Sequence, residues 1–281
     1  MKRETAALTA AALMGFAANS LLCRIALKSG SIDAASFTAV RLCSGAVVLA
    51  LLARATGGNR QHSGSWTSAA ALFVYALAFS FSYLQVSAGV GALLLFGAVQ
   101  FTMIGWGIAR GERPGFAQWA GIALAVCGLV VLTLPGVHAS PALGMVLMAA
   151  AGVAWGVYSL RGRGTARPLE TTAANFLRTL PMVAVALALS LAVAPAHATT
   201  EGVLLAVGSG SIASGIGYAL WYRALPGLTA TQAASLQLLV PLLAATAAVP
   251  VLNESVSLRL VAAAALILGG IGLSISTRKQ R

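Results

Sequence analysis

Two apolar segments joined by a short turn decide the fold of this chain. Residues 75–106 read YALAFSFSYLQVSAGVGALLLFGAVQFTMIGW and contain no Lys, Arg, Asp or Glu. We place the turn at residues 87–91, the SAGVG stretch. A helix needs about 20 residues to cross the hydrocarbon core of a membrane, so each flanking segment predicts one transmembrane helix. A similar pair recurs over residues 218–250, and we expect the two hairpins to face each other across a path through the membrane.

The composition of the whole chain is that of an all-α integral membrane protein. Of its 281 residues, 59% are hydrophobic and only 9% are charged, whereas soluble domains carry about 25% charged residues. Successive apolar stretches predict ten transmembrane helices, at residues 5–27, 34–53, 67–86, 89–109, 115–134, 142–160, 170–194, 202–222, 227–250 and 256–277. The intervening loops are short, so the lipid bilayer is the expected surrounding of nearly the whole chain.

The distribution of basic residues predicts the orientation in the membrane. If the N-terminus is cytoplasmic, 13 of the 18 Lys and Arg residues fall in cytoplasmic segments. The outside loops then hold only Lys28 and Arg259, and Arg24, Arg41 and Arg178 lie within predicted spans. Cytoplasmic loops of membrane proteins carry an excess of Lys and Arg. Both termini are therefore predicted to be cytoplasmic.

Two other interpretations of the composition fit less well. The net charge of +12 could indicate a nucleic-acid-binding protein. Most basic residues, however, sit just beyond the span ends, where they act as topology signals, so we expect no nucleic-acid partner. The first 20 residues resemble a signal peptide, but their apolar run continues to Leu27 and nine more predicted spans follow. We therefore predict an uncleaved first helix.

The chain contains a weak internal repeat. With an offset of 142 positions, Glu112 matches Glu254, Leu124 matches Leu266 and Gly128 matches Gly270. With an offset of 137 positions, Gly15 matches Gly152 and Arg41 matches Arg178. This repeat divides the chain into residues 1–137 and 138–281, with five predicted spans in each half. An odd number of spans forces the second half to enter the membrane from the other side, as in many transporters. The sequence thus predicts two inverted five-helix repeats around a central cavity.

Some of the same residues carry a resemblance to a known family. They are Gly111, Glu112, Gln118, Trp119, Gly121 and Gly128 in the first half, and Glu254, Gly270 and the LLVPLLAA segment around Pro241 in the second. With its ten predicted spans, the chain resembles the EamA type of the drug/metabolite transporter superfamily, and within it the exporters of aromatic amino acids. The resemblance implies export of small metabolites across the bacterial inner membrane. It also implies a central cavity lined mainly by the first, third, fourth, sixth, eighth and ninth spans.

Aromatic residues within the predicted spans are the main candidates for a cargo site. Tyr75, Phe79 and Tyr83 recur every four residues and therefore share one helical face. Trp155 and Tyr158 are three residues apart on one face of the sixth span. Helix packing or an aromatic belt at the membrane surface is the alternative explanation. The predicted substrate-binding residues are Tyr75, Phe79, Ser82, Tyr83, Gln100, Trp155, Tyr158 and Tyr218.

We expect other aromatic and amide side chains of the spans to have structural roles. An interfacial belt is the preferred interpretation of Trp221 and Tyr222, and Trp66 and Trp119 are expected to be interface anchors. A buried amide needs a partner in an apolar medium, so the amides should face protein or water rather than lipid. Bonding between helices or recognition of the cargo would satisfy them, the latter above all at Gln100. The amides in question are Asn19, Gln85, Gln100 and Gln237.

The charged residues of the spans also have a structural interpretation. Arg41 and Arg178 are expected to reach toward a membrane surface or to bond to backbone carbonyls. A cargo carboxylate would also fit, but the second and seventh spans lie outside the cavity wall in the resembled family. Glu112 and Glu254 precede the fifth and tenth spans, and we expect each carboxylate to stabilise the N-terminus of its own helix.

Proline and small residues predict bends and close helix contacts. Pro241 lies in the middle of the ninth span and is expected to kink it. Small residues at helical spacing let helices approach closely, so we assign the fifth and tenth spans to the scaffold or to a homodimer contact. These residues are Gly121, Ala125 and Gly128 in the fifth span, and Ala265, Gly269 and Gly272 in the tenth.

The sequence favours a transporter over an enzyme. His62, His138 and His197 all lie in loops, and no HExxH motif, Gly-rich phosphate loop or paired intramembrane Asp is present. We therefore expect no cofactor and no metal site. All six acidic residues fall in loops or at span ends, so no intramembrane carboxylate is available as a proton relay. We predict export of aromatic or apolar amino acids by alternating access without ion coupling. The alternatives are a proton-coupled drug/metabolite exporter, a membrane-embedded enzyme or an accessory subunit.

Overall fold

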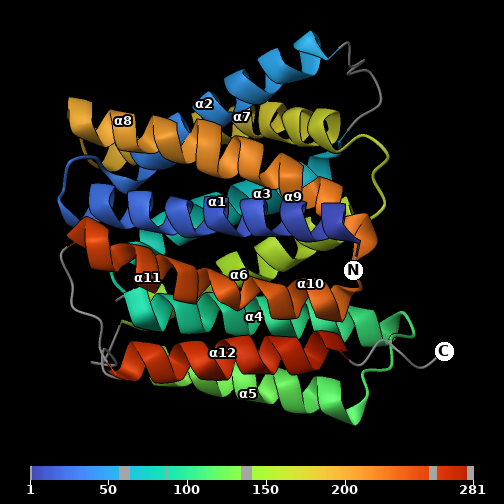
Figure 1. The fold of residues 1–281 in the computed structure, drawn as a ribbon. Helices are drawn as coiled ribbons and strands as arrows, with labels where there is room; N and C mark the ends of the chain where they lie inside the picture. Colours follow the sequence, from blue (N-terminus) through green and yellow to red (C-terminus); the bar gives the residue numbers. More distant parts are fainter. Residues whose placement is uncertain (1, 57–63, 87, 134–140, 253–257, 277–281) are drawn as a thin grey trace.

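The computed structural model describes residues 2–56, 64–86, 88–133, 141–252 and 258–276, and its regular elements are all helices (Figure 1). The first seven long helices are α1 (Arg3–Lys28), α2 (Ala34–Ala55), α3 (Trp66–Tyr83), α4 (Ala88–Ala109), α5 (Phe116–Thr133), α6 (Ala142–Gly162) and α7 (Pro168–Val193). They are followed by α8 (Thr200–Gly208), η2 (Ser209–Ile216), α9 (Gly217–Ala224), η3 (Leu225–Gly227), α10 (Ala230–Gln237), α11 (Leu239–Leu252) and α12 (Leu258–Ser276).

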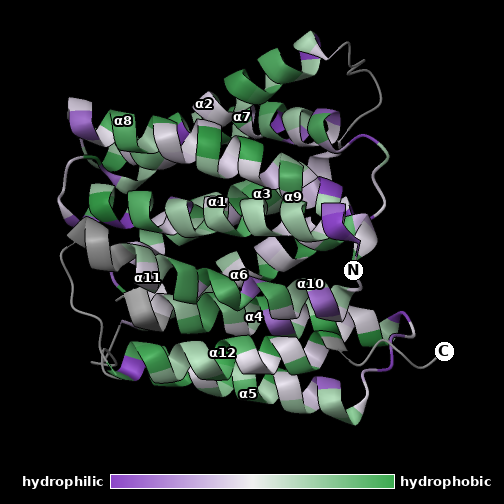
Figure 2. Cartoon of the chain, viewed as in Figure 1, coloured by the Kyte–Doolittle hydropathy of each residue, from purple (hydrophilic) through white to green (hydrophobic). Residues whose placement is uncertain are grey.

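The helices have the length and composition of membrane spans. In the described residues, nine helical stretches are long and apolar enough to cross a membrane, and α5 adds a shorter apolar helix. Hydrophobic residues cover most of the helix surfaces, while hydrophilic residues gather toward the helix ends (Figure 2). The start of α1 and the end of α12 lie at the same end of the bundle (Figure 1). The chain is therefore an all-α, multi-pass integral membrane protein, as predicted.

One predicted turn was misplaced, and two of the predicted spans are interrupted helices. The turn between the third and fourth spans lies earlier than residues 87–91, because α3 ends at Tyr83 and α4 begins at Ala88. The eighth span comprises α8, the π-helix η2 and α9 rather than one α-helix. The ninth is split into α10 and α11 at Leu238, one turn before Pro241. Proline cannot donate to the carbonyl four residues earlier, and its ring crowds that carbonyl, so the interruption at Leu238 agrees with the predicted kink.

The π-helix lies against α2 at a place where the backbones come very close. A Cβ atom at Gly210 in η2 would collide with the Arg41 carbonyl oxygen and the Ser44 hydroxyl of α2. A side chain at this position is therefore excluded. Single π-helical turns inside α-helices occur frequently at functional sites. Here the π-helix brings Ser209 and Ser214 into the buried interior.

The packing of the helices separates a central group from a flanking group. In the centre, α6 packs against α3 and α4, α1 packs against α8, η2, α9 and α11, and α10 packs against α4. At the flanks, α2 packs against α7 and α5 packs against α12 (Figure 1). The central helices are those that the resemblance predicted around the cargo path. Aromatic side chains fill the interior between them.

Small residues join α5 and α12 within one chain. A Cβ atom at Gly121 would lie 2.5 Å from the Gly270 carbonyl oxygen, and one at Gly270 would lie 2.5 Å from that of Gly121. The predicted small face of the fifth span is therefore occupied by α12. At the small face predicted for the tenth span, Ala265, Gly269 and Gly272 are exposed. A homodimer through these helices stays a prediction.

Polar contacts join segments far apart in the sequence at each end of the bundle. At one end Arg223 forms an ion pair with Glu4 at 2.7 Å. At the other, the His197 amide donates to the Asp33 carboxylate at 3.0 Å, and the Asp33 amide donates to the His197 carbonyl at 2.8 Å. Partial burial tends to raise the pKa of Asp33, but hydrogen bonds from Ser36, His197 and Ala35 outweigh it and hold the pKa below its usual value. The carboxylate is thus ionised at neutral pH.

Candidate functional site

The predicted aromatic stripe on α3 is continuous. The ring centroids of Tyr75 and Phe79 lie 5.5 Å apart, and those of Phe79 and Tyr83 lie 4.7 Å apart at an interplanar angle of 88°. Both distances are in the range of favourable aromatic contacts. Tyr75 and Phe79 are buried, and Tyr83 is half-buried at the end of the helix. The four-residue spacing correctly predicted that these rings share one face.

Trp155 of α6 lies at the centre of an aromatic cluster built from four helices. Its ring centroid is 5.0 Å from that of Tyr75, 4.6 Å from that of Tyr218 and 5.7 Å from that of Tyr158. Phe16 of α1 completes the cluster, with its ring edge-on to Trp155 at 5.0 Å. The sequence analysis missed Phe16, whose only signal was that it is a bulky aromatic residue in an Ala-rich first span. The predicted candidates on α3, α6 and α9 thus meet in space.

Arg41 lies beside this cluster rather than near a membrane surface, where it was expected. The side chain is fully buried, so it does not reach toward a membrane surface. Its Nη2 donates to the Tyr218 hydroxyl at 2.6 Å and to the Tyr75 hydroxyl at 3.4 Å, and its Nε donates to the Ser214 hydroxyl at 2.9 Å. Arg178, its counterpart in the repeat, donates to the Ala174 carbonyl at 3.1 Å, as expected. The two arginines therefore have different environments.

Asn19 of α1 connects the π-helix to the same polar group. Its Oδ1 accepts hydrogen bonds from the hydroxyls of Ser209 at 2.6 Å and Ser214 at 3.4 Å, and its Nδ2 is 3.5 Å from the Tyr75 hydroxyl. Tyr218 donates to Tyr75 through their hydroxyls at 3.3 Å. The interior thus contains an aromatic cluster bordered by a polar group of Asn19, Arg41, Ser209 and Ser214. We refer to the two together as the central site.

Other predicted polar residues make contacts between helices. Gln100 Nε2 donates to the Ala234 carbonyl at 2.7 Å, while its buried Oε1 has no hydrogen-bond partner among the described residues. The Trp155 indole donates to Gln237 Oε1 at 2.5 Å. The Ser82 hydroxyl donates to the Gly144 carbonyl of α6 at 2.7 Å. Gln100 therefore keeps an unused acceptor, whereas Ser82 joins α3 to α6.

The interfacial positions predicted for Trp221 and Tyr222 were wrong. Both side chains are buried in the bundle. The Trp221 indole donates to the Ser159 hydroxyl at 3.0 Å, and the Tyr222 hydroxyl donates to the Tyr158 carbonyl at 2.9 Å. Their proximity to a span end suggested a belt, but α9 turns this end toward α6. Trp66 and Trp119 are exposed, as expected for interface anchors.

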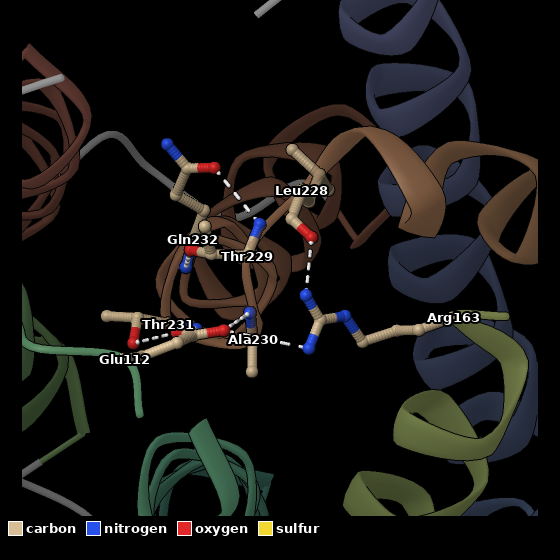
Figure 3. A network of polar contacts seen from close by, with 7 residues as sticks. All are labelled: Glu112, Arg163, Leu228, Thr229, Ala230, Thr231 and Gln232. Carbon is tan, nitrogen blue, oxygen red and sulfur yellow. Dashed lines mark hydrogen bonds and ion pairs between the residues drawn. The ribbon is translucent and has the colours of Figure 1, made fainter. Parts of the chain in front are cut away.

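Glu112 stabilises a helix other than the one predicted. It precedes α5, but its carboxylate accepts hydrogen bonds from the Ala230 amide at 2.8 Å and the Thr231 amide at 3.1 Å, at the N-terminus of α10 (Figure 3). The Thr231 hydroxyl adds a third bond at 2.8 Å. Arg163 lies 3.6 Å from this carboxylate and donates to the Leu228 carbonyl at 3.0 Å. Gly111 has φ +89°, which allows the sharp turn before Glu112. Glu254 lies outside the described residues.

The acidic side chains with described contacts lie away from the central site. Among the described residues, no three His, Cys, Asp or Glu side chains come together as a metal site would require. Glu4, Asp33 and Glu112 make their contacts at the ends of the bundle. His62 and His138 lie outside the described residues. The central site can therefore offer aromatic faces, neutral hydroxyls and amides, and the Arg41 guanidinium.

The apolar helices, with an aromatic cluster in their interior and a break in the ninth span, define a multi-pass membrane protein. The profile of the EamA-like transporter family matches residues 142–276. An uncharacterized protein of Pseudomonas aeruginosa is 50% identical over 280 residues, covering 99% of this chain and 97% of that protein. A probable terminal-alkyne amino-acid exporter of Streptantibioticus cattleyicolor is 30% identical over 214 residues, covering 72% of this chain and 70% of that protein.

The chain therefore belongs to the EamA-like transporter family of the drug/metabolite transporter superfamily. A crystal structure aligns with a TM-score of 0.76 at 23% identity, covering 95% of this chain and 96% of that one. At this identity, the alignment supports the shared fold alone.

Proposed function

We propose that this protein exports small aromatic or apolar amino acids across the bacterial inner membrane, with both termini in the cytoplasm. The observation that carries the proposal is the contact of Tyr75, Trp155 and Tyr218 in one buried cluster, with centroid separations of 4.6–6.4 Å. These rings can replace their contacts with one another by contacts with an aromatic or apolar cargo. Each aromatic pair formed with the cargo contributes about 0.5–1.5 kcal/mol beyond area burial. The terminal-alkyne amino-acid exporter is a relative whose named cargo is also an amino acid.

Alternating access is the proposed mechanism. Corresponding spans of the two predicted halves, residues 1–137 and 138–281, pack against each other. The pairs are α2 with α7, α5 with α12, and α4 with α10. This pairing supports the proposed inverted repeat. The break at Leu238 and the π-helix η2 interrupt the regular backbone bonding of two central helices. Such interruptions can absorb the backbone changes of a hinge. We propose that the segments on either side of them move as the site opens alternately to each side.

Transport is proposed to run down the gradient of the cargo without ion coupling. Proton-coupled carriers commonly use Asp, Glu or His within the membrane as relays. Here Glu4, Asp33 and Glu112 make their contacts at the ends of the bundle, and Glu170 and Glu201 lie in the first turns of α7 and α8. In proteoliposomes, a zwitterionic amino acid should then equilibrate without accumulating, and an imposed pH gradient should leave its initial rate unchanged. Accumulation driven by that gradient would favour the second candidate, a proton-coupled drug/metabolite exporter.

Uptake into proteoliposomes with a panel of amino acids tests the cargo. We expect tryptophan, phenylalanine and leucine to enter faster than threonine, because the central site offers mostly apolar surface. Empty liposomes and liposomes containing a heat-inactivated sample give the background. Uptake of none of these amino acids above that background would refute the proposed function.

A further inference from the structure

The Arg41 side chain is a buried cation without a carboxylate partner among the described residues. It has 0% exposure. A guanidinium has five N–H donors, and the hydrogen-bond partners of Arg41 are three neutral hydroxyls, those of Ser214, Tyr75 and Tyr218. Its Nη1 has no hydrogen-bond partner in the described part of the chain. The two N–H groups of Nη1 can thus donate to a further acceptor.

Such an arrangement is unfavourable unless an anion completes it. Removing a charge from water costs several kcal/mol even after relaxation, and an opposite charge with good hydrogen bonds is the usual compensation. The ion pairs of the described residues, Arg163 with Glu112 and Arg223 with Glu4, both lie at one end of the bundle. Arg41 is the eighth residue of α2, so its Cα lies about 10 Å along the axis from the start of that helix.

The position of the guanidinium indicates what the anion belongs to. The Arg41 Cζ atom lies 5.3 Å from the centroid of the Tyr75 ring and 5.8 Å from that of Phe79. Tyr75 belongs to the aromatic cluster of the central site, and Phe79 contacts its ring on α3. Consider a ligand whose apolar side chain packs against these rings. An acidic group one or two bonds from that side chain would then lie within reach of Arg41. An α-amino acid has this shape.

We infer that Arg41 binds the carboxylate of the cargo through its Nη1 edge, an inference that rests on the proposed function. Arg is suited to this role because its planar fork matches a carboxylate and stays charged at any physiological pH. The Nε and Nη2 bonds hold the guanidinium in place before the cargo arrives. Ser214 is itself positioned by the π-helix, which Asn19 joins to α1. The cargo class that follows is apolar molecules carrying a carboxylate, and apolar amines without one should bind more weakly.

The competing explanation is that Arg41 only connects α2 to α3 and α9. The two explanations differ in ligand selectivity. A structural arginine would affect all cargoes equally, whereas a carboxylate-binding arginine would distinguish acids from amines of the same ring and chain length. Three probes separate them: L-phenylalanine, 3-phenylpropionate, which lacks the amino group, and 2-phenylethylamine, which lacks the carboxylate.

The experiment measures binding of these three probes to the purified full-length protein in detergent by isothermal titration calorimetry. We expect the wild type to bind both acids about 10- to 100-fold more tightly than 2-phenylethylamine, the range for hydrogen bonds to charged groups. In Arg41→Gln the affinity for the acids should fall to that for the amine. Arg178→Gln is the matched control, since it removes the corresponding arginine of the other half, and it should bind like the wild type.

Each outcome decides the inference. Equal wild-type affinity for phenylalanine and 2-phenylethylamine overturns it, and so does an Arg41→Gln protein that folds and still prefers the acids. Those results leave the proposed transport function intact if uptake of phenylalanine persists. If the wild type neither binds nor transports any probe, both proposals fail. Should Arg41→Gln not fold, the wild-type comparison of acids with the amine decides alone.

Discussion

Replacing Glu112 tests the connection that joins the α4–α5 loop, α6 and α10. In Glu112→Ala, the Ala230 and Thr231 amides at the N-terminus of α10 lose their carboxylate acceptor, and the Thr231 hydroxyl loses its partner. Arg163 also loses the carboxylate 3.6 Å from its Nη1. The α10 segment keeps its own capping box, formed by Thr229 and Gln232 (Figure 3). The substitution therefore removes only the hydrogen bonds from Glu112 and leaves the N-cap of α10 intact.

The magnitude follows from these contacts. A hydrogen bond to a charged group contributes about 1.5–3 kcal/mol, and a carboxylate at a helix N-terminus contributes about 0.3–1 kcal/mol. The ion pair adds little, since at 3.6 Å the Arg163 Nη1 is too far from the carboxylate for a hydrogen bond. Water can replace part of the lost bonding at this end of the bundle. We therefore expect Glu112→Ala to lower the free energy of unfolding by about 2–4 kcal/mol, less than the sum of the separate bonds.

The assay is thermal unfolding in detergent, followed by intrinsic tryptophan fluorescence. Glu4→Ala is the matched control, because it removes the other described ion pair, whose side chains are 62% and 67% exposed. Exposed pairs contribute about 0–1 kcal/mol, so the Tm of the control should hardly change. Glu112→Gln keeps one acceptor without the charge and should lie between the two. Equal Tm values for Glu112→Ala and Glu4→Ala would refute the reasoning.

Three further predictions concern the cargo site, the π-helix and the orientation. Trp155→Ala should slow uptake of tryptophan or phenylalanine more than that of leucine, measured in proteoliposomes, because it removes the ring at the centre of the cluster; equal loss for all three would indicate a folding defect. Gly210→Ala should lower Tm, since its Cβ meets the Arg41 carbonyl and overpacking costs about 1–3 kcal/mol. Gly97→Ala is the control and should leave Tm unchanged, because no atom lies within 4 Å of its new Cβ. In a background lacking the three native cysteines, Ser29→Cys should react with an impermeant thiol reagent applied outside intact cells and Gly164→Cys should not; the reverse pattern would contradict cytoplasmic termini.

The sequence by itself determined the class of the protein and much of the aromatic site. The lengths of the apolar stretches predict membrane helices because hydrocarbon thickness sets a minimum span and lipid cannot satisfy exposed backbone groups. The four-residue spacing of Tyr75, Phe79 and Tyr83 predicts a shared face because it is close to one helical turn. Local rules of this kind need no knowledge of the neighbouring helices.

The contacts between polar groups, by contrast, depend on how the helices pack. Arg41 and Tyr218 are 177 positions apart, and their hydrogen bond depends on how α2 and α9 pack. Glu112 is next to α5 in the sequence but stabilises α10, because the Gly111 turn directs its carboxylate to a different helix end. Trp221 and Tyr222 had the sequence position of belt residues, yet the packing of α9 buries them. Partners distant in the chain leave no periodic signal, so a single sequence predicts the faces of helices better than the contacts between them.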